Sequence, residues 1–265
     1  MKRLDNKVAF ISGAGSGIGR ASALKFAGEG ARVLVAELDA ERGREVAAKV
    51  VEQGGEASFL QVDVTDEQAV IGAFQACMAQ FGQVDILVNC AGGSVADDKP
   101  ITEVDWDVWE RTMNLDLKGT LMCCRYGIPR LVSSGGGVIV NFTSVVALKG
   151  AFPGHIYTAA KGGIISFTQA LAGRYWRDGI RANAIAPGIV LSERVAGRMG
   201  IDTSAPSQAQ ITQALAIRSR LVDDRHPFGY GVPADIANIA AFLASDESRM
   251  INGAVIPAEG GAAAY

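Results

Sequence analysis

Short apolar runs alternate with longer amphipathic segments along most of the chain. The runs predict strands at residues 7–11, 31–37, 57–62, 84–89, 137–142, 180–185 and 253–259. Apolar positions three or four apart predict helices at residues 21–30, 40–53, 65–81, 101–127 and 233–246. Apolar strands that alternate with amphipathic helices are typical of a parallel sheet covered on both faces. The pattern therefore predicts an α/β fold with a doubly wound parallel sheet of about seven strands.

The stretch at about residues 189–231 departs from this alternation. It is richer in polar residues and has no strand pattern where one is expected, although residues 208–217 look helical. A long excursion inside a compact α/β domain is typical of a lid or binding loop, so we expect it to bind substrate. No linker, repeat or low-complexity tract divides the chain, and residues 1–265 are predicted to form one domain.

The composition favours a soluble globular protein. Of the 265 residues, 49% are hydrophobic and 20% are charged, and the net charge of −3 argues against a nucleic-acid-binding surface. No segment approaches the ~20 apolar residues of a membrane span, and the first apolar run is too short for a signal peptide. The four cysteines lack the spacing of a metal site or a disulfide framework. We expect a cytoplasmic protein with reduced cysteines, no metal, no nucleic acid and no membrane anchor.

A glycine-rich segment, SGAGSGIG at residues 12–19, follows the first predicted strand and opens a helix. Free N–H groups and the helix dipole at such a start favour a pyrophosphate, and glycines let the phosphates come close. A tight strand-to-helix turn without a ligand is the alternative. The position within the first βαβ unit favours a dinucleotide site. Its predicted residues are Gly13, Ser16, Gly17, Ile18 and Gly19.

An acidic residue, Glu37, closes the second predicted strand. Its carboxylate can accept hydrogen bonds from ribose hydroxyls and would repel a 2′-phosphate, which favours NAD over NADP. A solvated acid at a strand end is the alternative, and Arg20, Arg32 and Arg42 could weaken the selection. Further cofactor contacts are expected after the third and fourth strands. These are Asp63, Val64, Asn89, Ala91 and Gly92.

The five residues YTAAK place the phenol of Tyr157 and the amine of Lys161 four positions apart. In a helix these positions lie on the same face, so the two groups can reach a common point and move a proton. A tyrosine and a lysine at this spacing also occur by chance on amphipathic surfaces. The rest of the chain has to decide between the two interpretations.

Several motifs together resemble the short-chain dehydrogenase/reductase family over nearly the whole chain. They are the glycine segment at 12–19, NCAG at 89–92, Asn114, Ser144, YTAAK at 157–161 and Pro-Gly at 187–188. The resemblance implies a Rossmann-type fold and a nicotinamide cofactor. It also implies a homotetramer, with the helices around residues 104–133 and 155–177 packed between subunits. The chain departs from the family pattern near its end, where PAEGG replaces the frequent VDGG, and this puts the contacts of that segment in doubt.

The resemblance also implies the catalytic residues. Tyr157 would be the general acid/base, because a free phenol, with a pKa of about 10, is a poor base at neutral pH unless a cation such as that of Lys161 stabilises the phenolate. Ser144 would donate a hydrogen bond to the substrate oxygen, with Thr143 as the adjacent competitor. Asn114 resembles the helix asparagine whose main chain positions a proton-relaying water, although simple solvent exposure would also explain it.

The segment at 187–192 resembles the family segment that binds the nicotinamide. Its expected contacts are Pro187, Gly188, the Ile189 main chain and the Ser192 hydroxyl, together with Tyr157 and Lys161. The expected substrate pocket is Ser94, Ser144, Val145, Phe152, His155 and Tyr157. For His155 a purely structural role is the alternative.

These observations together predict an NAD-dependent oxidoreductase. It would transfer a hydride between nicotinamide and a secondary alcohol or ketone, and the substrate would be small and apolar or cyclic. An NADP-dependent carbonyl reductase is the rival enzyme. A dinucleotide-sensing protein without turnover would be expected to lack a catalytic group, and all four implied catalytic residues are present.

Overall fold

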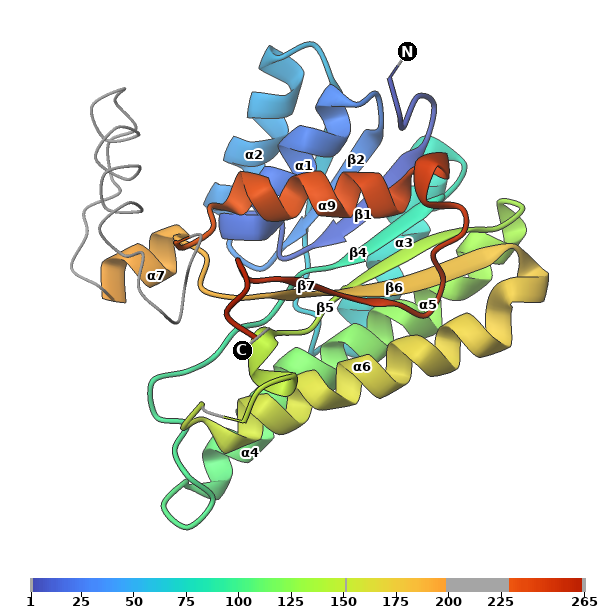
Figure 1. Cartoon of the computed structure of the whole chain (residues 1–265). Helices are drawn as coiled ribbons and strands as arrows, with labels where there is room; N and C mark the ends of the chain where they lie inside the picture. Colours follow the sequence, from blue (N-terminus) through green and yellow to red (C-terminus); the bar gives the residue numbers. More distant parts are fainter. Residues whose placement is uncertain (1, 151, 199–228, 264–265) are drawn as a thin grey trace.

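The computed structural model describes residues 2–150, 152–198 and 229–263. They form a parallel sheet between two layers of helices (Figure 1). The sheet has seven strands in the order β3-β2-β1-β4-β5-β6-β7, which confirms the predicted doubly wound fold. The strands are β1 (Val8–Ser12), β2 (Arg32–Glu37), β3 (Glu56–Gln61), β4 (Ile86–Asn89), β5 (Gly137–Phe142), β6 (Ile180–Pro187) and β7 (Val255–Ala258).

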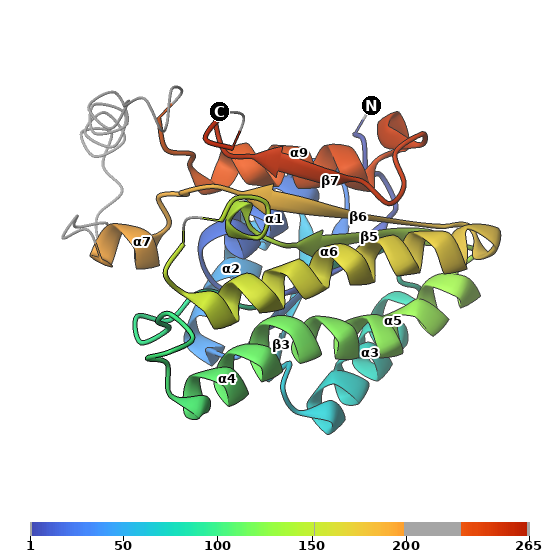
Figure 2. The same cartoon turned by 60° about the horizontal axis from the view of Figure 1, so that its bottom comes forward.

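Two groups of helices cover the two faces of the sheet, as Figures 1 and 2 show from different sides. One face carries α1 (Gly17–Gly28), α2 (Ala40–Glu52) and α9 (Pro233–Ala244). The other carries α3 (Glu67–Phe81), α4 (Trp106–Thr112), α5 (Gly119–Ser133) and α6 (His155–Tyr175). A short helix, α7 (Glu193–Arg198), lies beyond the edge where the strands end. Among the described residues, no helix combines the length and the apolar character needed to cross a bilayer.

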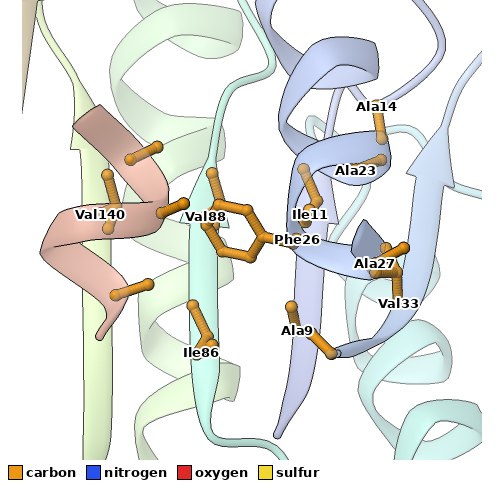
Figure 3. Packing of buried hydrophobic residues seen from close by; sticks show 14 of the residues in the cluster. Ala9, Ile11, Ala14, Ala23, Phe26, Ala27, Val33, Ile86, Val88 and Val140 are labelled. Atoms are coloured by element: carbon orange, nitrogen blue, oxygen red, sulfur yellow. The ribbon is translucent and has the colours of Figure 1, made fainter. Parts of the chain in front are cut away.

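Each face of the sheet has its own apolar core. Phe26 of α1 is fully buried against Ile11 of β1 and Val88 of β4 (Figure 3). On the other face, Phe10 of β1 stacks on Phe74 of α3, with 4.2 Å between the ring centroids. Successive strand residues point to opposite faces, so Phe10 and Ile11 serve the two different cores. Burial of each such side chain contributes about 1.5–3 kcal/mol to the free energy of unfolding. Packing on both faces thereby holds the strands, and the loops at their ends, in place.

The longest predicted helix, at residues 101–127, is wrong at its start and interrupted in its middle. Residues 101–105 form turns and irregular backbone, and α4 begins only after the extended Asp105. Between α4 and α5, the segment Met113–Lys118 is a π-helical turn, η1. Its wider winding closes with the Gly119 N–H donating to the carbonyl of Asn114, five residues earlier. Turns of this kind occur frequently at functional sites.

The predicted substrate loop at about 189–231 lies mostly outside the described residues, and the predicted helix at 208–217 lies wholly outside them. Its two described ends lie side by side, because Val190 and Gly231 form an isolated parallel bridge. The Leu191 N–H donates to the Gly231 carbonyl at 2.9 Å, and the Gly231 N–H donates to the Ile189 carbonyl at 3.0 Å. The segment therefore leaves and rejoins the sheet at one place, beside the end of β6.

Candidate active site

The predicted site residues converge at the edge of the sheet where the parallel strands end. Ser12, the last residue of β1, is level with Asn89, the last residue of β4, and Asn89 is level with Asn141 of β5. Strand β1 has β2 on one side and β4 on the other, so the strand order reverses here. Ligands of open α/β sheets bind beyond the carboxyl ends of the strands at such a switch point.

The loop between β1 and α1 requires glycine at several positions. Gly13 and Gly17 have φ angles of 64° and 51°, in the left-handed region that disfavours other residues. A Cβ at Gly13 would lie 2.7 Å from the Ala91 Cα, and one at Gly19 would lie 2.0 Å from the Gly13 carbonyl oxygen. The loop is therefore pressed against both α1 and the turn after β4. A plain tight turn would not need this close approach at both places.

The start of α1 offers backbone N–H groups to two carboxylates. The Gly15 N–H donates to Oε2 of Glu37 at 2.8 Å, and the Gly17 N–H donates to Oε2 of Glu193 at 3.0 Å. Ser16, the N-cap residue, makes no side-chain capping bond to the helix, so side chains from other elements supply the acceptors here. Both acceptors are oxyanions, which is the chemistry that a pyrophosphate would bring to a helix start.

Glu37 lies directly over the glycine loop. A Cβ at Gly15 would lie 2.6 Å from Cγ of Glu37, so any other residue there would have to displace the glutamate side chain. The other carboxylate oxygen, Oε1, accepts the Asp39 N–H at 3.1 Å. The remaining predicted loop residue, Ile18, is partly buried and packs on the apolar core below. The acid that is predicted to hold the ribose therefore borders the loop that is predicted to hold the phosphates.

A chain of polar groups runs beneath the site and fixes the turn after β4. The Ser12 hydroxyl accepts the Cys90 N–H at 3.2 Å and the Ala91 N–H at 3.4 Å. Within the sheet, the Asn89 side-chain amide donates to Oδ1 of Asn141 at 2.8 Å. Asn89 is buried, so its side chain supports the turn from inside. The predicted contacts Ala91 and Gly92 follow directly in this turn.

The turn after β3 is built by Asp63, another predicted cofactor contact. Its Oδ1 accepts both the Thr65 N–H, at 2.8 Å, and the Thr65 hydroxyl, at 2.7 Å. The next residue, Val64, is buried against the start of α5, where a Cβ at Gly119 would lie 2.8 Å from Cγ2 of Val64. Asp63 and Val64 both follow β3 at the edge of the sheet where the strands end, and Val64 packs this edge against α5.

The start of α6 is anchored by Asp98, which the sequence did not indicate. Oδ2 of this buried carboxylate accepts the Tyr157 N–H at 2.8 Å, and Oδ1 accepts the Ile156 N–H at 3.2 Å. Gly154, the N-cap residue, has no side chain to do this. A carboxylate at a helix N-terminus satisfies free N–H groups and interacts favourably with the helix dipole. Asp98 thereby fixes the main chain that carries Tyr157.

Tyr157 and Lys161 lie one turn apart on α6, so the helical part of the prediction is confirmed. Nζ of Lys161 is 5.5 Å from the centroid of the Tyr157 ring. The lysine is buried, and its ammonium donates to the carbonyl of Phe142 at 3.1 Å. It also pairs with Oδ1 of Asp116 at 3.0 Å. The ammonium is therefore held in place by an ion pair, a carbonyl and an aromatic ring.

The electrostatics of Lys161 follow from these neighbours. Burial has the largest effect and acts to lower the pKa of the ammonium, because a charge is costly away from water. Negative charge on Tyr157 and Asp116 acts in the opposite direction and prevails, so the pKa of Lys161 is raised. The ammonium thus stays charged beside the Tyr157 ring.

Of the two hydroxyls after β5, Ser144 is the one available to a substrate. The Thr143 hydroxyl donates to the carbonyl of Lys161 at 2.7 Å and so ties β5 to α6. The Ser144 oxygen accepts the Val146 N–H at 3.4 Å, which leaves its proton free to donate. Val145, a predicted pocket residue, starts the 3-10 turn Val145–Ala147 that follows.

Asn114 and Asp116 both lie on the π-helical turn, but they face different groups. The Asn114 side chain borders a cavity of about 530 Å³ and makes no hydrogen bond to a described residue. Asp116, two residues later, is the residue that reaches Lys161. No local pattern in the sequence indicates it, because residues one position apart do not share a face of a helix and the leucines beside Asp116 therefore do not reveal its burial. The cavity is lined by Thr65, Gly93, Val95, Glu110, Arg111, Thr112, Asn114, Leu115, Asp116 and Lys118.

The predicted nicotinamide segment runs from the end of β6 towards the glycine loop. The Gly188 N–H donates to the Ala258 carbonyl at 3.1 Å, which ties the Pro187-Gly188 turn to β7. Ile189 is exposed. A Cβ at Gly17 would lie 3.2 Å from Cβ of Ser192, so the fold brings Ser192 next to the glycine loop.

The predicted substrate residues are divided between two places. Phe152 and His155 line a second cavity of about 460 Å³, and the Phe152 ring meets the Tyr157 ring edge-on at 6.1 Å. Ser94 precedes Val95, which borders the first cavity. His155 Nδ1 accepts the Ile101 N–H at 3.1 Å, and this contact gives it a structural role at the start of α6. The second cavity is lined by Val146, Lys149, Gly150, Phe152, Pro153, His155 and Thr158.

Comparisons with known proteins agree with this geometry. A family model described as enoyl-(acyl carrier protein) reductase matches residues 13–263. The chain is 35% identical to cis-4-hydroxycyclohexanecarboxylate dehydrogenase of Sinomonas cyclohexanicum, over 96% of each chain. It is also 35% identical to meso-2,3-butanediol dehydrogenase of Serratia marcescens, over 99% of this chain and 96% of the relative. A solved short-chain dehydrogenase/reductase from Mycobacterium ulcerans superposes with a TM-score of 0.86 at 27% identity, covering 98% of this chain and 91% of the other.

The chain belongs to the short-chain dehydrogenase/reductase family. It is an oxidoreductase of the hydride-transfer type that acts on an alcohol or ketone with a nicotinamide cofactor. The residues present fit such a dinucleotide. The glycine loop lets its main chain lie close to α1 and to the turn after β4, and the N–H groups of Gly15 and Gly17 are directed at carboxylate oxygens, which is the geometry that phosphate oxygens would also use.

Proposed function

We propose that this protein is an NAD-dependent dehydrogenase of small secondary alcohols, which also reduces the corresponding ketones. The observation that carries the proposal is the pairing of Tyr157 with a buried, charged Lys161 at the edge of the sheet where the glycine loop lies. A phenol beside a fixed cation can both remove and return a proton near neutral pH. This is the proton chemistry that alcohol oxidation requires.

Three side chains would divide the work. Tyr157 takes the hydroxyl proton of the alcohol, or returns it to the alkoxide during ketone reduction. Ser144 donates a hydrogen bond to the substrate oxygen, and a preorganised donor of this kind is worth about 3–4 kcal/mol in related oxyanion sites. Lys161 favours the phenolate through its charge and helps to bind the cofactor. The nicotinamide, when bound, accepts or supplies the hydride.

The preference for NAD rests on Glu37. A carboxylate over the glycine loop would repel a 2′-phosphate, while it can accept bonds from free ribose hydroxyls. An arginine could weaken this selection by pairing with the 2′-phosphate. Two of the three arginines nearby in the sequence already pair with acids, which supports the proposal. Arg20 pairs with Glu45 at 3.1 Å, and Arg42 pairs with Asp39 at 3.4 Å.

The substrate is proposed to be a compact secondary alcohol, cyclic or vicinal. The two relatives described above are named for a hydroxycyclohexane acid and for a butanediol, both of which carry a secondary hydroxyl. Phe152, edge-on to Tyr157, offers an apolar wall of matching size. The test is to follow reduced nicotinamide by its absorbance for a panel of cyclic and vicinal alcohols, with NAD and with NADP. A higher kcat/KM with NADP would overturn the cofactor assignment, and no turnover across the panel would overturn the substrate class.

We also propose a cytoplasmic homotetramer. Trp106 and Trp109 on α4 are 70% and 37% exposed and lie edge-on to one another, which is typical of an interface patch. Cys77, Cys123 and Cys124 are buried free thiols, and unpaired cysteines are typical of a reducing compartment. Light scattering during gel filtration would test for four times the chain mass, and cell fractionation would test the compartment.

A further inference from the structure

Among the ion pairs between described residues, the pair of Lys161 and Asp116 is the one with both side chains buried. The two side chains are 5% and 1% exposed, and Nζ lies 3.0 Å from Oδ1. A buried ion pair of this kind is costly to desolvate and is weak evidence for a stabilising role. Its position beside the proposed proton-transfer residue calls for another explanation.

The carboxylate of Asp116 is held in a fixed orientation. Its Oδ1 accepts the Gly93 N–H at 2.8 Å in addition to the Lys161 ammonium. A Cβ at Gly92, where φ is 139°, would lie 2.4 Å from the same oxygen and 3.4 Å from Nζ of Lys161. The turn at Gly92 and Gly93 is thus shaped around the ion pair.

The two oxygens of Asp116 differ in their contacts with the described residues. Oδ2 is buried and makes no hydrogen bond to any described residue. The side chain also borders the cavity of about 530 Å³ described above. A purely structural acid would be expected to use both oxygens, because a buried oxygen without a hydrogen bond is destabilising. The contacts of Asp116 with described residues therefore all use Oδ1, the oxygen that pairs with Lys161.

Within the described part of the chain, three titratable groups act on the charge of Lys161. They are Tyr157 on the same helix, Asp116 on the π-helical turn and Cys90 after β4. Burial raises the pKa of the Cys90 thiol to about 12, so Cys90 stays neutral at physiological pH. Tyr157 alternates between phenol and phenolate during the proposed reaction. Asp116 is the one of these three that can supply a constant negative charge.

We propose that Asp116 is a positioning residue for proton transfer: it keeps Lys161 protonated and fixed in place throughout the catalytic cycle. The reason is electrostatic. When Tyr157 is protonated, the buried ammonium would have no counter-charge without Asp116, and burial would then favour the neutral amine. A neutral Lys161 no longer favours the phenolate. This inference rests on the proposed function of Tyr157 and Lys161.

The test compares Asp116→Asn, which removes the charge with little change of shape, with Asp116→Glu, which keeps it. For the wild type, kcat for alcohol oxidation should show no alkaline decline up to about pH 10, because Lys161 stays charged. Asp116→Asn should lower kcat about tenfold at pH 7 and should lose a further factor of about ten per pH unit above the lowered lysine pKa. Asp116→Glu should have a lower kcat than wild type but should not show this loss of kcat at alkaline pH. Asp107→Asn, on the exposed face of α4, is the matched control.

Thermal unfolding supplies a readout that needs no turnover. In Asp116→Asn the folded-state pKa of Lys161 falls below its unfolded value, so the unfolded chain binds the extra proton. The loss of Tm relative to wild type should therefore be largest near pH 6 and should shrink towards pH 10. A loss of Tm that is the same at every pH would show a packing role and would overturn the proposal.

The outcomes separate this proposal from the function on which it rests. If Tyr157→Phe abolishes turnover while Asp116→Asn keeps the wild-type pH profile, the role of Asp116 is refuted and the proposed function stands. If Tyr157→Phe retains turnover, the proposed function itself is refuted. If Asp116→Asn does not fold, Asp116→Glu decides: a new alkaline decline in a variant that keeps the carboxylate contradicts the proposal, and its absence together with reduced kcat supports it.

Discussion

The backbone N–H of Gly15 donates a hydrogen bond of 2.8 Å to the carboxylate of Glu37. This contact joins the glycine loop to the acid that ends the second strand, and a second main-chain bond, from the Asp39 N–H, also holds that carboxylate. Under the proposed function, this one side chain would decide between the two nicotinamide dinucleotides, because its charge would repel a phosphate on the adenosine ribose.

Replacing Glu37 with alanine tests this dependence. We expect Glu37→Ala to lower the ratio of kcat/KM for NAD over NADP by about tenfold or more, equivalent to about 1.4 kcal/mol, because the repulsion of the 2′-phosphate is removed. Steady-state kinetics with both cofactors measures the ratio. Glu52→Ala, at the end of α2, is the control and should leave it unchanged. An unchanged ratio in Glu37→Ala would show that selection lies elsewhere.

Removal of the Tyr157 hydroxyl should separate binding from chemistry. Tyr157→Phe is expected to reduce kcat by about 10²–10⁴-fold, the usual contribution of a positioned acid/base, with little change in NAD affinity. Fluorescence titration with NAD and single-turnover kinetics measure the two quantities. Tyr175→Phe, at the end of the same helix, serves as the control. Turnover within threefold of wild type would refute the proton role.

Loss of the Asp98 carboxylate should affect both stability and activity. Asp98→Ala leaves two N–H groups at the start of α6 without their acceptor, which should cost about 1–2 kcal/mol of unfolding free energy and displace Tyr157. Asp98→Asn keeps one acceptor oxygen, so its unfolding free energy and its kcat should lie between those of wild type and Asp98→Ala. Urea unfolding and kcat at saturating substrate provide the measurements. A fully active Asp98→Ala variant would contradict a positioning role.

The core beneath the glycine loop should respond as a close-packed interior. Phe26→Ala is expected to lower the free energy of unfolding by about 3–5 kcal/mol, because α1 cannot close the cavity against β1 and β4. Val132→Ala, exposed near the end of α5, should cost less than about 0.5 kcal/mol. Chemical denaturation of both variants measures the difference. Similar losses in the two would mean that the burial of Phe26 contributes little.

Stability should decline in acid through Glu29. Hydrogen bonds from Arg3 and Lys25 lower the pKa of this carboxyl from 4.5 to about 2. A depressed acid stabilises the folded state fully above its unfolded pKa, and this contribution is lost as the pH falls from about 4.5 towards 2. The difference in unfolding free energy between wild type and Glu29→Gln should therefore shrink between pH 6 and pH 3. A constant difference over this range would exclude the linkage.

The sheet could be predicted from sequence because its strands are continuous apolar runs. Buried on both faces, a strand such as Val8–Ser12 needs no polar alternation, and its run of apolar residues is visible without any tertiary information. The spacing of Tyr157 and Lys161 was equally visible, since both lie on one regular helix.

The residues that support the site could not be predicted in the same way. The π-helical turn inserts a residue into the helical repeat, so the spacing of 3.6 residues no longer shows whether Asn114 or Asp116 faces Lys161. Asp98 is 58 residues away from Ile156, which it caps, and Glu193 is 176 residues away from Gly17. Contacts between residues so far apart in the sequence arise from the topology of the fold, so no local sequence pattern predicts them.

The bond between Gly17 and Glu193 ties the start of α1 to the start of α7. A backbone N–H serves one acceptor well, so under the proposed function a phosphate oxygen would have to displace the Glu193 carboxylate from this donor. The affinity for the coenzyme would then include the cost of that displacement, and removal of this carboxylate would tighten binding.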